Sequence, residues 1–221
     1  MSNNKAEVIE KIKQIGVLPV IRANSEQEAR QVIEAVKKGG ITTIEITMTV
    51  PNAVELIKNL SSDYGNEILI GAGTVLDAKT AADCINAGAK FIISPALNLD
   101  TIKFCNEQAI VVMPGALTPT EILMAWNAGA DFVKVFPASA MGGASYLKAI
   151  KAPLPHIKLI PTGGVSLATA AEFIKSGAEA VGVGGELVDL QAIRENRPEI
   201  ITERAKQYLE IVKTAKAEAR A

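Results

Sequence analysis

Short apolar runs rich in β-branched residues alternate along the chain with longer segments in which apolar residues recur at helical spacing. Such runs favour buried parallel strands, because a strand covered on both faces reads as an almost continuous apolar stretch. The predicted strands are Val17–Arg22, Thr43–Met48, Ile68–Gly73, Phe91–Ser94, Ile110–Pro114, Phe132–Val135, Ile157–Pro161 and Ala180–Gly184. Their last residues follow one another at intervals of 20 to 26 positions. This near-constant spacing predicts a repeated structural unit.

Each interval is long enough for one amphipathic helix that returns the chain to the start of the next strand. The predicted helices include Ser25–Lys38, Ala53–Leu60, Ala78–Ala87, Leu99–Glu107, Thr120–Asn127 and Leu167–Ser176. Eight such units predict an α/β fold, a single (β/α)8 TIM barrel domain over residues 1–221, with extra helices at about 3–14 and about 198–219. A doubly wound open sheet is the alternative. It would need a nucleotide-binding fingerprint near its first strand, and Gly16–Asn24 contains none.

Composition narrows the class of partner. Apolar residues make up 48% of the chain, which is enough for a sizeable core. The 23 lysines and arginines nearly balance the 24 aspartates and glutamates, and no basic cluster indicates nucleic-acid binding. The N-terminus is charged and amphipathic, unlike a signal peptide, and the apolar stretches are too short to span a membrane. We therefore expect a soluble, cytoplasmic protein with no nucleic-acid or membrane partner.

The chain has a single histidine, His156, in a predicted loop. Nucleophile systems that pair serine or cysteine with histidine are therefore not expected, and a zinc site built on several histidines is excluded by count. Cys84 and Cys105 fall in predicted helices without metal-type spacing. We expect no metal and no cofactor, so acid–base chemistry must use carboxylates, lysine, hydroxyl groups or water.

Lys134 lies in the apolar run Asp131–Pro137, which reads as a buried strand. Charged side chains are almost never buried without a partner or a function. An amine that has lost its hydration is a candidate nucleophile for a carbonyl carbon, which is the first step of Schiff-base chemistry. A structural ion pair and a fixed cation in a phosphate or carboxylate pocket explain a buried lysine equally well. This strand alone does not separate the three interpretations.

Polar residues at strand ends are candidates for the site, because barrel enzymes build their active sites at the carboxyl ends of the strands. Glu45 shares one face of its predicted strand with Thr43 and Thr47, so it is expected to point inward, either as a functional carboxylate or in a salt bridge to Lys134. Arg22 ends the first strand.

Two glycine-rich loops follow the seventh and eighth strands. Pro161–Gly164 and Gly182–Gly185 place backbone N–H groups where barrels commonly bind phosphate, although tight turns alone also favour glycine. A lysine, a carboxylate, an arginine and an anion cradle at one rim suit a lyase that acts on a phosphorylated 2-keto acid.

The ordered motifs resemble the 2-keto-3-deoxy-6-phosphogluconate (KDPG) and 4-hydroxy-2-oxoglutarate (KHG) aldolases from about Val17 to Val188. The matching segments are Glu45–Thr47, Gly71–Thr74, Ser94–Pro95, Met113–Gly115, Thr118–Glu121, Lys134–Pro137, Pro161–Val165 and Gly182–Gly184. No single motif is specific for this family, but the set of motifs in this order is.

The resemblance implies a metal-independent class I aldolase that releases pyruvate, and a homotrimer. Lys134 would form the Schiff base and Glu45 would move protons through a bound water. The expected substrate-binding residues are Arg22, Thr74, Pro95, Thr162, Gly163, Gly164, Gly184 and Gly185.

The chain departs from the family pattern at two of these positions. Thr49 stands where the better-studied branch has a carboxylate-binding arginine, and Arg22 is expected to supply that charge, as a clamp for the carboxylate or the phosphate. Gly185 stands where many members have a serine beside the phosphate, which leaves unphosphorylated KHG open as a substrate. An isomerase or epimerase barrel and a non-catalytic barrel for binding or assembly are the remaining alternatives.

Overall fold

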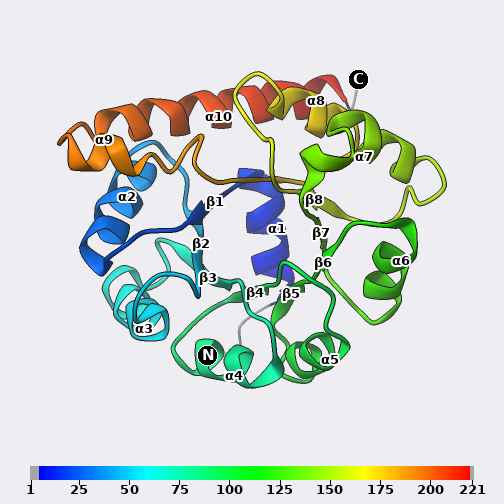
Figure 1. Ribbon diagram of the computed structural model, residues 1–221, viewed down its shortest axis with the longest axis horizontal. Helices are drawn as coiled ribbons and strands as arrows, with labels where there is room; N and C mark the ends of the chain where they lie inside the picture. The colour runs from blue at the N-terminus through cyan, green and yellow to red at the C-terminus, as the bar shows by residue number, and fades with distance from the viewer. Residues whose placement is uncertain (1–4, 220–221) are drawn as a thin grey trace.

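The computed structural model describes residues 5–219 of the chain. Its strands are β1 (Val17–Ile21), β2 (Thr43–Thr47), β3 (Leu69–Gly73), β4 (Phe91–Ile93), β5 (Val111–Met113), β6 (Gly115–Ala116), β7 (Val133–Val135), β8 (Leu159–Pro161) and β9 (Val181–Val183). Each predicted strand is confirmed to within two residues at either end. Figure 1 shows the strands in a ring, with most of the helices outside it.

The helices are α1 (Lys5–Ile15), α2 (Glu26–Lys38), α3 (Ala53–Tyr64), α4 (Ala78–Asn86), α5 (Leu99–Glu107), α6 (Pro119–Asn127), η1 (Ala138–Met141), α7 (Ala144–Lys151), α8 (Ala170–Lys175), α9 (Leu190–Arg194) and α10 (Glu199–Glu218). The six helices named between the strands are confirmed, with α8 shorter and α3 longer than predicted. The expected N-terminal helix is α1, and the start of its predicted range at residues 3 and 4 lies outside the described residues. The expected C-terminal helix is α10. Within residues 5–219, no helix is long and apolar enough to cross a membrane.

The strands pair in parallel with their neighbours in the chain, and the first strand also pairs with the last. One sheet has the order β5-β4-β3-β2-β1-β9, and a second has the order β6-β7-β8. A doubly wound sheet reverses its direction of growth along the chain. Here β1 to β5 follow one another in a single direction and β1 pairs with the last strand, β9, so the order contradicts that alternative.

The expectation of one continuous eight-stranded ladder is confirmed only in part, as a parallel α/β fold with a curled six-stranded sheet. Pro114 separates β5 from β6, because proline lacks the N–H that a continuous ladder needs. β8 and β9 meet only through the isolated bridges Leu159↔Ala178 and Thr162↔Gly182. The ladder is therefore interrupted at two places in the described chain.

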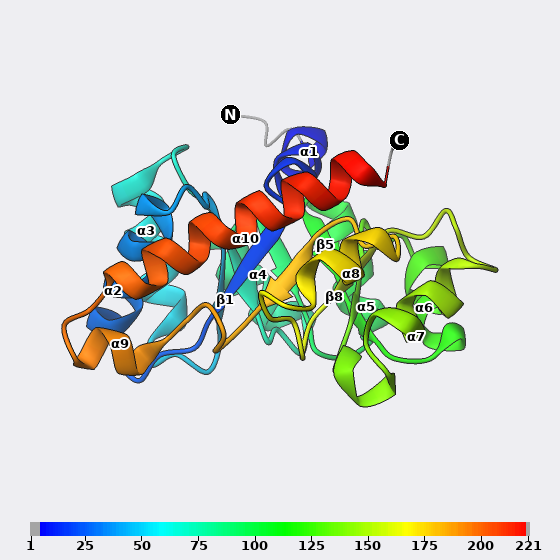
Figure 2. The same cartoon turned by 90° about the horizontal axis from the view of Figure 1, so that it is seen from above.

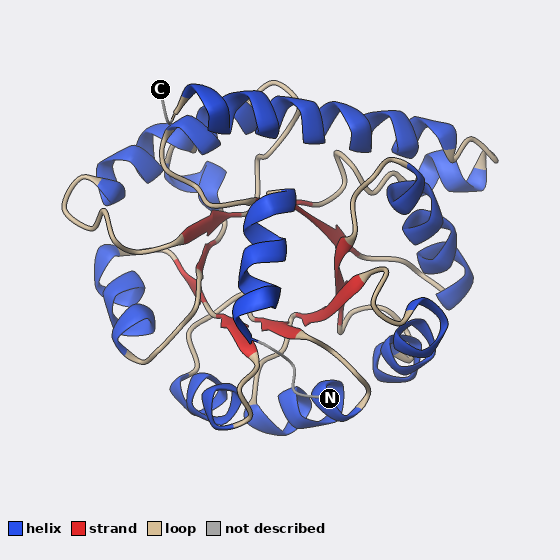
Figure 3. Cartoon of the chain, turned by 180° about the vertical axis from the view of Figure 1, so that it is seen from behind, coloured by secondary structure: helices blue, strands red, loops and turns tan. Residues whose placement is uncertain are grey.

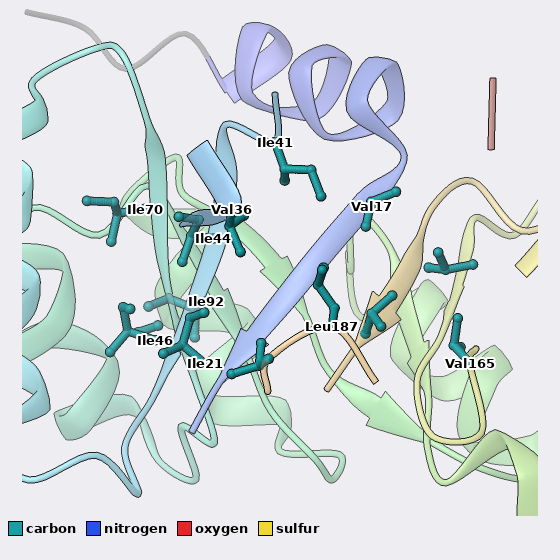
Figure 4. Packing of buried hydrophobic residues seen from close by; sticks show 14 of the residues in the cluster. Val17, Ile21, Val36, Ile41, Ile44, Ile46, Ile70, Ile92, Val165 and Leu187 are labelled. Atoms are coloured by element: carbon teal, nitrogen blue, oxygen red, sulfur yellow. The ribbon is translucent and has the colours of Figure 1, made fainter. Parts of the chain in front are cut away.

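Two apolar clusters lie on opposite faces of the strands. The larger fills the space between strands and helices, and Figure 4 shows part of it, including Ile21 on β1 with Ile44 and Ile46 on β2. The smaller lies inside the ring and includes Leu18, Phe91 and Phe132. Glu45 alternates with Ile44 and Ile46, so it faces the inside, as its period-2 position predicts.

Helix α1 covers the amino-terminal end of the ring, as seen from behind in Figure 3 and from above in Figure 2. Its buried residues Val8 and Ile12 join the inner cluster. Lys5 fixes the helix further, because its Nζ lies 2.9 Å from Asp131 Oδ2 and 2.8 Å from Asn106 Oδ1. With this end closed by apolar packing, the polar residues collect at the opposite end, where the strands finish.

Candidate active site

Lys134 and Glu45 form an ion pair inside the ring. Lys134 lies in the middle of β7 and Glu45 in the middle of β2, on different sheets. Their Nζ and Oε1 atoms are 3.5 Å apart, and the residues are only 4% and 1% exposed. The predicted inward position of Glu45 and the predicted burial of Lys134 are both confirmed. The cost of removing two charges from water can exceed the free energy gained from their attraction. A contribution to stability alone therefore does not explain why this pair is buried.

The carboxylate of Glu45 fits because β3 has no side chain at the adjacent position. A Cβ added to Gly73 would lie 1.9 Å from Glu45 Oε1, and one added to Gly71 would lie 2.1 Å from the Phe91 ring. Neither glycine has a positive φ angle, so space and not backbone conformation requires glycine here. In the sequence, Gly73 was recognised only as part of a family motif. Its packing role could be identified only once the structure placed β2 next to β3.

We expect Gly73→Ala to lower kcat by about 10-fold or more, because the added methyl group must push the Glu45 carboxylate away from Lys134. Steady-state kinetics with thermal unfolding of the same variant check this. Gly71→Ala is the matched comparison, since its methyl group meets Phe91 and not Glu45. If both variants lose the same stability and have the same kcat, the space at Gly73 is not what keeps Glu45 next to Lys134.

Phe136 is a site residue that the sequence did not single out. The Lys134 Nζ lies 5.5 Å from the centre of its ring, which is within cation–π range. Phe136 follows Lys134 by two positions, so strand alternation places both on the inner face. Its half-buried ring therefore forms part of the wall next to the amine. The same alternation in the sequence could have identified Phe136 as a residue on the inner face.

Arg22 and Thr49 lie at the rim, and both are exposed. No hydrogen bond or ion pair to Arg22 is present among residues 5–219, so its guanidinium group is available to a ligand. The Thr47 hydroxyl donates to the Ile21 carbonyl oxygen at 3.0 Å, and the Thr47 and Thr49 hydroxyl oxygens are 2.6 Å apart. Because Thr47 has only one proton, Thr49 must be the donor in that second bond. Thr49 therefore offers only lone pairs to a ligand.

Thr74 and Pro95 directly follow β3 and the β4 segment, as predicted. Thr74 is half-buried and has a φ of 59°, a left-handed conformation that is costly for a β-branched residue. Pro95 lies against β6, because a Cβ on Gly115 would come within 2.2 Å of the Pro95 carbonyl group. Both residues lie at the carboxyl rim.

The two glycine loops lie at the same rim and differ in why they contain glycine. Gly163 and Gly164 have φ angles of 93° and 74°, which favour glycine over any other residue. Gly184 and Gly185 have no positive φ, and a Cβ at either would meet nothing within 4 Å. Glycine at these two positions keeps the space above the loop free.

Backbone donors in both loops are available to a ligand. Within residues 5–219, the N–H groups of Gly164, Gly185 and Glu186 donate to no backbone acceptor. Thr162 is buried, and its side chain leans over Gly182, where a Cβ would lie 2.2 Å from the Thr162 hydroxyl oxygen. Free N–H groups at neighbouring strand ends suit an anion such as a phosphate or carboxylate.

The other reactive side chains lie elsewhere. Cys84 and Cys105 are on α4 and α5, where burial raises the pKa of each thiol to about 12. His156 packs edge-on against Trp126, with ring centroids 6.1 Å apart. Among the described residues, no group of three or more His, Cys, Asp or Glu side chains is arranged to hold a metal ion. The ion pair of Lys134 and Glu45 is thus the centre of the site.

Known proteins resemble this chain over most of its length. The family model for KDPG and KHG aldolase matches residues 8–203. The 2-dehydro-3-deoxy-phosphogluconate aldolase of Pseudomonas aeruginosa is 36% identical over 158 residues, which are 72% of this chain and 71% of that protein. The KHG/KDPG aldolase of Escherichia coli K12 is 32% identical over 194 residues, 88% and 91% of the two chains.

A solved structure is similar as well. It is that of KDPG aldolase from Legionella pneumophila, with pyruvate captured at low pH as a covalent carbinolamine intermediate. It is 31% identical to this chain with a TM-score of 0.83, and the match covers 90% of this chain and 96% of that one.

Proposed function

Because this chain belongs to the KDPG and KHG aldolase family, we propose that Lys134 is the residue on which its substrate forms a Schiff base. The chain is a lyase that cleaves KDPG or KHG to pyruvate and an aldehyde. The observation that carries the assignment to Lys134 is its buried amine, 3.5 Å from the Glu45 carboxylate. A covalent carbinolamine in the Legionella relative supports an amine nucleophile in this family.

The reaction begins when Glu45 accepts a proton from the Lys134 ammonium group. The neutral amine attacks C2 of the 2-keto acid and forms a carbinolamine, and protonation of its hydroxyl group by Glu45 releases water to leave an iminium ion. The positive charge is then on the iminium nitrogen, which is Lys134 Nζ, next to a carboxylate that is buried and fixed. One acid–base group in direct contact with the amine is sufficient for these steps.

Cleavage follows from the iminium ion, which accepts the electron pair of the C3–C4 bond. Glu45, through a water molecule, takes the proton of the C4 hydroxyl group as the aldehyde forms and leaves. It returns a proton to C3 of the resulting enamine. Water then hydrolyses the pyruvyl imine and regenerates Lys134. The aldehyde is glyceraldehyde 3-phosphate from KDPG or glyoxylate from KHG.

The substrate's anionic groups are bound at the rim. Arg22, which has no side-chain partner among the described residues, binds the keto acid carboxylate, and Thr74 and Pro95 contribute to binding at the same rim. Thr49 offers only lone pairs, so it accepts a hydrogen bond from a substrate hydroxyl group or water and does not bind a carboxylate. The N–H groups of the two glycine loops, with Thr162, bind the phosphate.

Replacing Arg22 with methionine is expected to raise KM for the keto acid by about 10- to 100-fold, the usual loss for one charge-assisted hydrogen bond. The concentration of pyruvate needed for half-maximal trapping on Lys134 should rise equally, because pyruvate carries the carboxylate but no phosphate. Arg197→Met is the control, since Arg197 pairs with Glu195 on the surface. An unchanged pyruvate dependence with weaker KDPG binding would assign Arg22 to the phosphate instead.

The preferred substrate is tested by kcat/KM for KDPG, for its galactonate epimer and for KHG under identical conditions. The free N–H groups of the glycine loops favour the phosphorylated substrates. If KHG has the largest kcat/KM, the phosphate assignment for these loops is wrong, whereas the Schiff base on Lys134 is unaffected.

Two features of the whole molecule also belong to the proposal. The Asp131 N–H, just before β7, donates to the Val112 carbonyl oxygen on β5 at 3.1 Å, and this link between the two sheets supports a single closed (β/α)8 barrel. A homotrimer is the expected assembly, and sedimentation equilibrium of the purified protein tests it. A cytoplasmic location stays a prediction.

A further inference from the structure

The loop between β9 and α9 is held from behind by one side chain. The loop, Gly184–Asp189, makes a tight turn in which the Leu187 and Val188 N–H groups both donate to the Gly184 carbonyl oxygen, at 3.0 and 2.8 Å. Gly185 and Glu186 at its tip are exposed. These two hydrogen bonds fix the base of the turn but do not fix the tip, where the free N–H groups lie.

Arg204 on α10 contacts the loop near its tip and at its end. Its Nη1 donates to the Glu186 carbonyl oxygen at 3.2 Å and lies 3.0 Å from Asp189 Oδ2. A bound Glu186 carbonyl group orients the peptide plane that precedes Leu187, and so restrains the neighbouring N–H groups of Gly185 and Glu186. Burial raises the pKa of Tyr208 on α10 to about 12, and the charge of the Glu186 carboxylate adds to that shift.

Asp189 joins this contact to the next helix. Its Oδ1 accepts the Ala192 N–H at 3.0 Å as the N-cap of α9. That hydrogen bond and the Arg204 guanidinium hold the pKa of Asp189 below its ordinary value, so the carboxylate stays charged at neutral pH. The side chains of Arg204 and Asp189 are 34% and 25% exposed, which makes this pair less solvated than most of the surface pairs of the chain.

The anchor itself is rigid, because α10 packs closely on α2. A Cβ on Gly39 would lie 2.4 Å from the Ala205 Cβ, and the Thr202 hydroxyl group donates to the Ala35 carbonyl oxygen at 2.9 Å. Figure 2 shows α10 running along one side of the molecule with α9 next to its first turns. Arg204 thus connects a packed helix to a loop whose tip N–H groups donate to no backbone acceptor within residues 5–219.

We propose that Arg204 is a positioning residue that holds the Gly184–Asp189 loop in the conformation that binds the substrate phosphate. This inference rests on the proposed phosphate-binding role of the loop. Arg204 does not touch the substrate. It keeps the Gly185 and Glu186 N–H groups directed at the phosphate. The entropy cost of ordering the loop therefore belongs to folding and does not weaken substrate binding.

The test compares Arg204→Met with the wild-type enzyme. We expect KM for KDPG and the inhibition constant of inorganic phosphate to rise by about 10-fold, because a small displacement of a binding group is enough for such a loss. The kcat for KDPG and the pyruvate dependence of borohydride trapping should stay within about 2-fold, since neither involves the phosphate loop. Arg204→Lys should recover part of the affinity, because an ammonium group still pairs with Asp189.

Lys206→Met is the matched control on the same helix, where Lys206 pairs with the exposed Glu203. The proposal is overturned if Arg204→Met leaves both phosphate-dependent constants unchanged. It is also overturned if kcat and pyruvate trapping fall in parallel with phosphate affinity, which would indicate general loosening. If inorganic phosphate does not inhibit even the wild-type enzyme, the phosphate role of the loop fails first. That outcome is separate from a failure at Arg204.

Discussion

Replacing Lys134 with arginine is expected to abolish turnover, with a loss of about 10⁵-fold or more, the scale seen when a covalent nucleophile is removed. Arginine keeps the positive charge beside Glu45 and also beside the Phe136 ring. Its guanidinium group stays protonated and cannot form an imine with a ketone. The substitution therefore separates a nucleophilic amine from a fixed cation and from a structural ion pair, the three explanations for a buried lysine.

The measurement is kcat for KDPG and KHG, together with thermal unfolding and circular dichroism. Lys134→Met is the companion variant, and it should be destabilised by about 3–5 kcal/mol, because it leaves the Glu45 carboxylate buried without its partner. Adding Glu45→Gln to it should restore much of that stability. Lys134→Arg activity within about 100-fold of the wild-type value would show that charge, and not imine formation, is what the reaction needs.

Glu45→Gln is expected to lower kcat by about 10²- to 10⁴-fold, the range for loss of a general acid–base group. Glutamine has nearly the same shape, so it fills the space next to Gly73 without a clash. It cannot accept the amine proton, release the carbinolamine water or protonate the enamine. All proton transfers on the substrate should slow together, while substrate binding at Arg22 and the glycine loops is kept.

Single-turnover kinetics locate the slow step in the Glu45→Gln variant. The pyruvyl adduct on Lys134 should still form, but more slowly than in the wild-type protein. The exchange of the pyruvate methyl protons with solvent should slow by a similar factor, since it requires proton transfer at C3. A variant that keeps wild-type exchange and turnover would assign the proton transfers to another group and leave Glu45 as a structural partner of Lys134.

The sequence predicted those parts of the molecule that depend on local pattern. Lys134 and Glu45 were identifiable because each is a charge inside an apolar strand, and alternation with Ile44 and Ile46 placed Glu45 on the inner face. The strands were predicted within two residues because buried parallel strands read as continuous apolar runs. These patterns can be read along the sequence without knowing which residues are neighbours in space.

The remaining features depend on neighbours that are distant in the chain. The space that Gly73 leaves for Glu45 exists only because β2 and β3 pair at that register. Arg204 reads in sequence as an ordinary solvated charge on a long helix, and its contact with Glu186 appears only when α10 packs on α2. Helix α9 has five residues, too short for a periodic pattern, so it was not predicted.

The most direct test of the account is borohydride reduction of the wild-type protein in the presence of pyruvate, followed by intact mass and peptide mapping. The account predicts one pyruvyl adduct per chain, located on Lys134, and no adduct in Lys134→Arg under the same conditions. An adduct on another lysine, or none while KDPG is still cleaved, would contradict the assignment of Lys134 as the Schiff-base residue.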